Sequence, residues 1–147
     1  MDPRHDKSNE DNTYTRNKIR NIVIPYIKKE FNPNFIDTLY RLSEISKEES
    51  EYIEKKVEES FDAIVEEISE KQIVLDLKRF NEEDLVIKRR LILYSVKKLF
   101  GTTKGIEKIH IEDIIKLCLN NIGNKYLTPN KNTKVSVGKG KIVIEKI

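Results

Sequence analysis

Apolar residues recur at steps of three and four positions along most of the chain, with polar residues between them. This spacing places the apolar side chains on one face of a helix, because an α-helix has 3.6 residues per turn. The pattern predicts four amphipathic helices, near residues 14–31, 34–70, 82–100 and 110–122. Few residues that disfavour helix interrupt them, since the chain has only 5 Gly and 4 Pro.

The second predicted helix is the longest. Its apolar stripe consists of Phe35, Leu39, Leu42, Ile45, Tyr52, Ile53, Val57, Phe61, Ile64 and Ile68. The opposite face carries an excess of Glu and Asp. Because most globular helices are shorter, we expect this one to bend or to span two regions of the fold.

Four features predict where helices bend, begin and end. Pro25 has no N–H, so it should kink the first helix or split it in two. The Asn-Pro-Asn sequence at 32–34 predicts a turn followed by a helix start. Asn81, three residues before Asp84, resembles an N-cap for the third helix, and Gly101 predicts its end.

The period changes to two near the C-terminus. Residues 134–137 and 141–145 alternate in this way around Gly138 and Gly140, which is typical of a β-hairpin. Residues 73–77 are β-branched and short, and they fit either a strand or an extended connector. The predicted fold is therefore mainly α, a helical bundle with one long helix and a small C-terminal hairpin.

Composition adds a strong charge asymmetry. The chain is 37% hydrophobic and 36% charged, with a net charge of only +3. Residues 32–70 carry a net charge of −8 and residues 71–147 a net charge of +9. The basic block can attract a phosphate backbone that the acidic block repels. An ordinary solvated surface with uneven charge explains the same numbers.

Most catalytic chemistry is missing from the sequence. The single cysteine, Cys118, lies in an apolar run that favours a buried position, and one cysteine cannot form an intrachain disulfide. His5 and His110 lack metal-ligand spacing, so no metal site is predicted. No stretch reaches the roughly 18 apolar residues of a membrane span, and the charged N-terminus lacks the apolar core of a signal peptide. We expect a cytoplasmic protein without a membrane partner.

Arg16 and Arg20 form the one constellation with a specific chemical meaning. They are four residues apart and therefore share a helix face. Two guanidinium groups near a helix N-terminus can hold a phosphate. Pairing with Asp6, Asp11 or another nearby carboxylate is an equal alternative.

The residues around these arginines resemble a known family. Residues 6–20, DKSNEDNTYTRNKIR, resemble the DxSN…YxRNxIR signature of bacterial tRNA(Ile)-lysidine synthases. Pro25, the turn at 32–34, the later helices and the terminal hairpin continue the resemblance, which weakens after about residue 70. Asn21 departs from the family, which often has His at this position, so no role that needs that His is expected.

The resemblance implies an activity for the whole family protein. Such an enzyme uses ATP and magnesium to adenylate the wobble cytidine of tRNA(Ile) with a CAU anticodon, and lysine then displaces AMP to give lysidine. The family's ATP-pyrophosphatase domain carries a Ser-Gly-Gly-x-Asp-Ser phosphate loop, and this sequence has none. Residues 1–31 would be the C-terminal edge of that catalytic domain and its connecting helix, and residues 32–147 a helical domain that holds the tRNA. No cofactor is expected in this chain by itself.

The resemblance also implies roles for particular residues. Asp6, Ser8 and Asn9 would belong to a loop that closes the catalytic domain, and Tyr14 belongs to the same signature. Arg16 and Arg20 would face the cleft, toward ATP phosphates or the tRNA backbone, as candidate contributors to catalysis, while Asn17 would fix the loop by hydrogen bonds. Candidates for tRNA phosphate contact are Lys88, Arg89, Arg90, Lys97 and Lys98, for which a solvated helix face is an equal alternative.

These observations lead to two hypotheses of different classes. The chain is a part of a tRNA(Ile)-lysidine synthase that helps to hold tRNA and is inactive without the ATP-binding domain, its partner in the parent ligase. Alternatively, it is a standalone helical module that binds a protein partner or forms a homodimer through the long stripe. An independent enzyme is the least supported reading, because no nucleotide loop or nucleophile–base pair is present.

Overall fold

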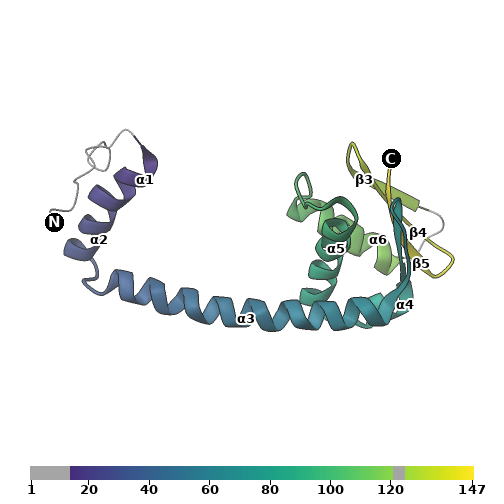
Figure 1. The fold of residues 1–147 in the computed structure, drawn as a ribbon, viewed down its shortest axis with the longest axis horizontal. Helices are drawn as coiled ribbons and strands as arrows, with labels where there is room; N and C mark the ends of the chain where they lie inside the picture. Colours follow the sequence, from purple (N-terminus) through teal and green to yellow (C-terminus); the bar gives the residue numbers. More distant parts are fainter. Residues whose placement is uncertain (1–13, 121–124) are drawn as a thin grey trace, which may run out of the picture. The chain divides into compact units, whose positions relative to one another are not determined.

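The computed structural model describes residues 14–120 and 125–147 (Figure 1). The chain divides into two compact units, Met1–Glu49 and Ser50–Ile147. The longest helix, α3 (Phe35–Ile64), contributes to both units. The boundary expected from the sequence, between residues 31 and 32, stays a prediction about the parent protein's domains.

In the first unit, the helical run predicted at 14–31 has three parts: α1 (Thr15–Lys18), a π-helical turn η2 (Ile19–Val23) and α2 (Ile24–Glu30). Pro25 lies in the first turn of α2, directly after the π-helical turn. A carbonyl four residues before a proline finds no N–H there, and an i→i+5 pattern offers it the next one. The predicted interruption at Pro25 therefore takes the form of a widened turn.

The helix α3 begins where the sequence predicts but ends earlier. The side chain of Asn32 accepts the backbone N–H of Asn34 at 2.9 Å in the preceding turn. The helix stops at Ile64, and the chain continues as strand β1 (Val65–Ile68). The predicted span of 34–70 was wrong at its C-terminal end. Ile64 and Ile68 satisfy the helical period, but the intervening residues pair with a strand instead.

A five-stranded antiparallel sheet corrects the predicted fold class, so the protein is mixed α and β rather than a helical bundle with a small hairpin. The strand order is β1-β2-β5-β4-β3. The strands after β1 are β2 (Gln72–Asp76), β3 (Lys125–Asn130), β4 (Thr133–Gly138) and β5 (Lys141–Lys146). The predicted hairpin is present as β4 and β5. Residues 73–77, for which the sequence fitted either a strand or a connector, lie mostly in strand β2.

The hairpin owes its shape to a two-residue turn. Lys139 and Gly140 have φ angles of 51° and 77° between the paired residues Gly138 and Lys141. Positive φ at both central positions defines a type I′ turn, whose twist matches that of the strands. In the sheet the pair does not stand alone, because β5 also pairs with β2 from Lys141 to Glu145.

The core of the second unit lies on one face of this sheet. Paired residues share a face, and two rows of apolar side chains cross the three central strands. One row is Ile73, Ile144 and Val135, and the other is Leu75, Ile142 and Val137. All six are buried, together with Val57, Phe61 and Ile64 from the end of α3.

Three helices complete this core: α4 (Leu77–Glu82), α5 (Leu85–Phe100) and α6 (Lys108–Asn120). Figure 1 shows α5 and α6 on one side of the sheet. The single helix predicted at 82–100 begins only at Leu85, because Asn81 belongs to the separate helix α4 and Asp84 is the N-cap residue. Gly101 ends α5 as predicted, with a φ of 75° and its N–H bonded to the carbonyl of Lys97 at 2.8 Å.

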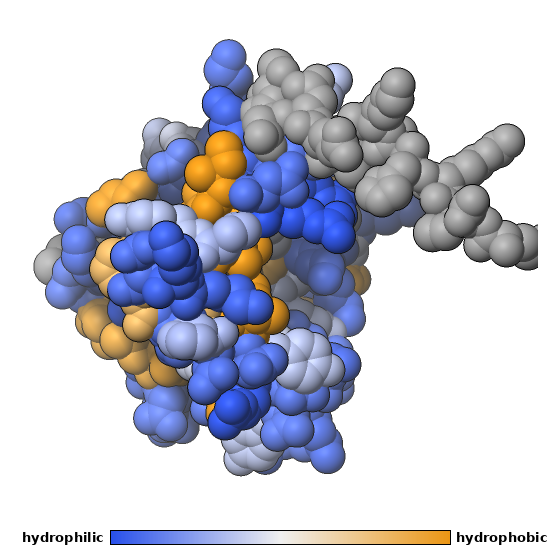
Figure 2. All heavy atoms as spheres, turned by 90° about the vertical axis from the view of Figure 1, so that its left-hand side faces the viewer, coloured by the Kyte–Doolittle hydropathy of each residue, from blue (hydrophilic) through white to orange (hydrophobic). Residues whose placement is uncertain are grey.

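The first unit has apolar side chains at its surface. Leu39, Leu42 and Ile45 of α3 are 45%, 56% and 54% exposed. Ile22 and Phe31 of the preceding segment are exposed as well. Figure 2 shows apolar groups that reach the surface between hydrophilic ones. The long predicted stripe therefore packs against the core only from Ile53 to Ile64, and Ile68 is 52% exposed.

Candidate nucleic-acid interface

A groove lies between α3 and α5 in the second unit. Its volume is about 520 Å³. This volume falls within the range of about 300–1,000 Å³ that is typical of ligand sites. The groove is lined by Glu54, Val57, Glu58, Arg90, Leu93, Tyr94, Lys97, Lys98 and Thr103.

The two walls of the groove carry opposite charges. Glu54 and Glu58 come from α3 and lie one turn apart, while Arg90, Lys97 and Lys98 come from α5. Among the residues that the structure describes, no ion pair within 4.0 Å connects the two walls. The three cations therefore stay available to a ligand.

The floor of the groove is aromatic and apolar. Tyr94 packs edge-on against the buried Phe61, with ring centroids 5.0 Å apart. The ammonium of Lys98 lies 5.2 Å from the centroid of Phe61 and 5.4 Å from that of Tyr94. A cation at this distance is attracted by the ring face, so the aromatic pair helps to hold Lys98 in position.

The structure separates the five cations that the sequence proposed for phosphate contact. Arg90, Lys97 and Lys98 line the groove. Arg89 instead pairs with Glu112 of α6, with 2.8 Å between Nε and Oε1. Lys88 is only 8% exposed and points its ammonium at the carbonyl of Asn81, 2.8 Å away.

Lys88 thus connects α5 to the end of α4, and we expect it to act on stability. The substitution Lys88→Met keeps most of the apolar stem but leaves the Asn81 carbonyl without this donor. A bond to a charged donor contributes about 1.5–3 kcal/mol, so urea denaturation should show a loss of that order in the free energy of unfolding. RNA affinity and its salt dependence should not change in this variant. A flatter salt dependence would instead show that the Lys88 ammonium reaches a phosphate.

The signature residues lie in the first unit. Arg16 and Arg20 are exposed, and among the described residues neither forms an ion pair. Tyr14 is 65% exposed, and Asn17 is half-buried. Asp6, Ser8 and Asn9 lie outside the described residues, as does Asp11, so the choice between a phosphate clamp and pairing with Asp6 or Asp11 stays open.

The described residues do not form a site for ATP and magnesium on their own. No group of three His, Cys, Asp or Glu residues among them is arranged to hold a metal ion. The exposed arginines 16 and 20 suit a phosphate, but no glycine-rich loop in this sequence supplies the backbone N–H cradle that a nucleotide needs. No catalytic step is therefore assigned to ATP or to magnesium.

The side chains of His110 and Cys118 are held in structural positions rather than in a reactive site. Nδ1 of His110 accepts the backbone N–H of Glu107 at 3.1 Å, as a capping residue does at a helix start. Burial raises the pKa of the Cys118 thiol to about 12, so the thiol stays protonated at neutral pH. No helix in the described ranges is long and apolar enough to cross a membrane.

The acidic wall and the aromatic floor were not among the predicted site residues. The spacing of these residues did carry a signal. Glu54 and Glu58 are four residues apart, as are Arg90 and Tyr94, so each pair shares one face of its helix. The sequence alone does not show that these two helix faces meet, because that depends on how α3 and α5 pack around Phe61.

Comparisons with known proteins identify the family. No family model matches the chain. A tRNA(Ile)-lysidine synthase of Clostridioides difficile (strain 630) is 40% identical over 149 aligned residues, which cover 98% of this chain and 31% of that protein. The tRNA(Ile)-lysidine synthases of Caldanaerobacter subterraneus subsp. tengcongensis and Clostridium acetobutylicum are 39% and 35% identical over 80% and 87% of the chain, and over 25% and 27% of their own lengths. The chain thus belongs to the tRNA(Ile)-lysidine synthase family and spans between 25% and 31% of the length of these relatives.

Proposed function

We propose that this chain is the tRNA-holding part of a tRNA(Ile)-lysidine synthase and that the groove between α3 and α5 is where it contacts RNA. The observation that carries the proposal is the set of three cations, Arg90, Lys97 and Lys98, which line the groove beside Tyr94 and form no ion pair with the residues that the structure describes. Cations bind the phosphate backbone, and aromatic rings take unstacked bases. The net charge of +9 on residues 71–147 supports the same function.

The parent protein in this proposal converts the wobble cytidine of tRNA(Ile) to lysidine in the cytoplasm with ATP, magnesium and lysine. This chain contributes binding and is inactive by itself, because its sequence lacks a phosphate loop. Arg16 and Arg20 add positive charge in the first unit, for an ATP phosphate or the tRNA backbone. The relatives' name, tRNA(Ile)-lysidine synthase, supports the choice of RNA.

Fluorescence anisotropy with labelled, unmodified tRNA(Ile) tests this function directly. We expect saturable binding at low salt, with log K falling linearly as log salt rises. A groove with three phosphate contacts predicts a slope of about −2 to −3, since each contact adds about 0.7–0.9. Absence of binding at about 50 mM salt would contradict the proposal.

A second candidate function is self-association through the first unit. The exposed apolar side chains of Leu39, Leu42 and Ile45 favour it, because contiguous apolar surface marks interaction sites. We expect light scattering to show a dimer at high protein concentration. The double substitution Leu39→Glu and Leu42→Glu should return it to a monomer, whereas Tyr52→Glu, on an exposed position of the same helix outside this unit, should not. A sharp monomer for the unaltered chain would exclude this candidate.

A further inference from the structure

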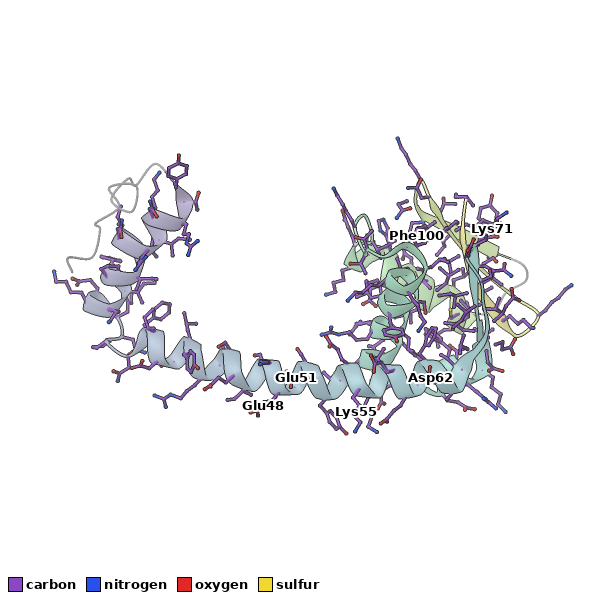
Figure 3. All side chains as sticks on the ribbon, in the orientation of Figure 1. Glu48, Glu51, Lys55, Asp62, Lys71 and Phe100 are labelled. Carbon is purple, nitrogen blue, oxygen red and sulfur yellow. The ribbon has the colours of Figure 1, made fainter. Side chains whose placement is uncertain are left out.

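The opposite charges on the two walls of the groove restrict what part of an RNA it can take. A phosphate near α5 meets Arg90, Lys97 and Lys98, but one near α3 meets Glu54 and Glu58. The repulsion from two carboxylates opposes a backbone that runs along the α3 wall. The acidic character extends along α3, where Figure 3 labels Glu48, Glu51 and Asp62.

The carboxylates of Glu54 and Glu58 are exposed and can accept a hydrogen bond from a ligand. Ionised Glu accepts hydrogen bonds and cannot donate them. No cation of the described residues lies within 4.0 Å of Glu54 or Glu58. A nucleobase with an exocyclic amino group supplies such a donor, as cytosine N4 does to Glu or Asp in DNA recognition. The edge of a base therefore suits the α3 wall, and the phosphates on either side of that base suit the α5 wall.

The floor provides the third element of such a site. Tyr94 lines the groove beside Val57 and Leu93, and its ring packs edge-on against Phe61. Stacking on an aromatic side chain tolerates any base, so it holds the nucleotide without selecting it. The two carboxylates would supply the selection.

We infer that the groove binds one unpaired RNA nucleotide that carries an amino group on its base, cytidine or adenosine, with the base toward Glu54, Glu58 and Tyr94. The phosphates of this nucleotide and its neighbours lie toward Arg90, Lys97 and Lys98. This inference rests on the proposed RNA-binding function. It adds that a base, rather than backbone alone, enters the groove.

The double substitution Glu54→Gln and Glu58→Gln distinguishes a base in the groove from backbone alone. The direction of the change in tRNA(Ile) affinity decides between these two binding modes. If only backbone lies in the groove, removal of two negative charges strengthens tRNA(Ile) binding. If the carboxylates accept from a base, binding weakens by about tenfold, because bonds to charged acceptors are lost. The slope of log K against log salt should stay unchanged, since no phosphate contact is removed.

The preference among RNA bases and the effect of replacing the Tyr94 ring provide two further tests. The unaltered chain should bind hexamers of cytidylate or adenylate more tightly than uridylate, and the double variant should lose this preference. Tyr94→Leu should weaken binding by about tenfold, whereas Tyr94→Phe keeps the ring and should restore it. Thermal melting verifies that each variant is folded.

The outcomes separate the two proposals. Tighter tRNA binding by the carboxylate variant, or equal binding of all hexamers, would overturn the inference and leave RNA binding by the groove intact. Failure of the unaltered chain to bind any RNA would overturn both.

Discussion

Replacement of Arg90, Lys97 and Lys98 by alanine should weaken the binding of tRNA(Ile) by about 100-fold at low salt, since each lost phosphate contact costs roughly tenfold or somewhat less there. The reason is that all three cations line one groove and have no carboxylate partner within the described part of the chain. The dependence of log K on log salt should also flatten by about 2–3, one for each contact. Anisotropy titrations at several salt concentrations measure both quantities.

A matched control variant removes three positive charges outside the groove. Lys116, Lys125 and Lys131 are exposed and do not line the groove. Their combined replacement by alanine should change the affinity far less than the groove variant does. Equal losses in the two variants would show that diffuse positive charge, rather than the groove, attracts the RNA. Because Lys98 lies over two aromatic rings, the melting temperature of the groove variant must be compared with that of the unaltered chain.

The substitution Phe61→Ala should lower the free energy of unfolding by about 3–5 kcal/mol, which is typical of a buried aromatic residue replaced by alanine. Phe61 is 0% exposed, and it joins the end of α3 to Tyr94 of α5. Its removal leaves a cavity that the surrounding rows of sheet residues cannot fill. The melting temperature should fall by about 10 °C, because 1 kcal/mol corresponds to about 2–4 °C in chains of this size.

Tyr52 provides the control on the same helix. It is 65% exposed, so Tyr52→Ala should change the free energy of unfolding by less than about 0.5 kcal/mol. Denaturant titrations of the two variants measure the contrast. If Phe61→Ala were as stable as Tyr52→Ala, the core would not include the end of α3, and the α3 wall of the groove would lose its support. RNA binding by folded Phe61→Ala should also weaken, since Tyr94 and Lys98 lose the ring that positions them.

The helices were predictable because their signals are local. Gly101 ends α5 where the sequence predicts, and the buried positions Leu91, Ile92, Val96 and Leu99 follow the helical period. The hairpin of β4 and β5 was likewise predictable, since alternation and a two-residue turn lie within 14 residues.

The sheet was not predictable in the same way. Strand β1 has Val65 and Ile68, which fit the helical stripe of α3 as well as a short strand. Strand β3 contains Pro129 and shows little alternation, and none of its side chains is buried. Both strands exist because they pair with neighbours, β1 with β2 and β3 with β4, and the central pairing of β2 with β5 joins residues about 70 positions apart.

By itself, the sequence determined the family signature at residues 6–20, the helical faces and the basic character of α5, because each depends on residues that are near one another in the chain. Only the tertiary structure decided that Lys88 is buried, that Arg89 pairs with Glu112, and that Arg90, Lys97 and Lys98 face Glu54 and Glu58 across a groove. A helical period shows that residues share a face, but the contacts of that face are fixed by packing. Here the packing of α3 and α5 around Phe61 divides five cations into the buried Lys88, the ion-paired Arg89 and three that line a groove.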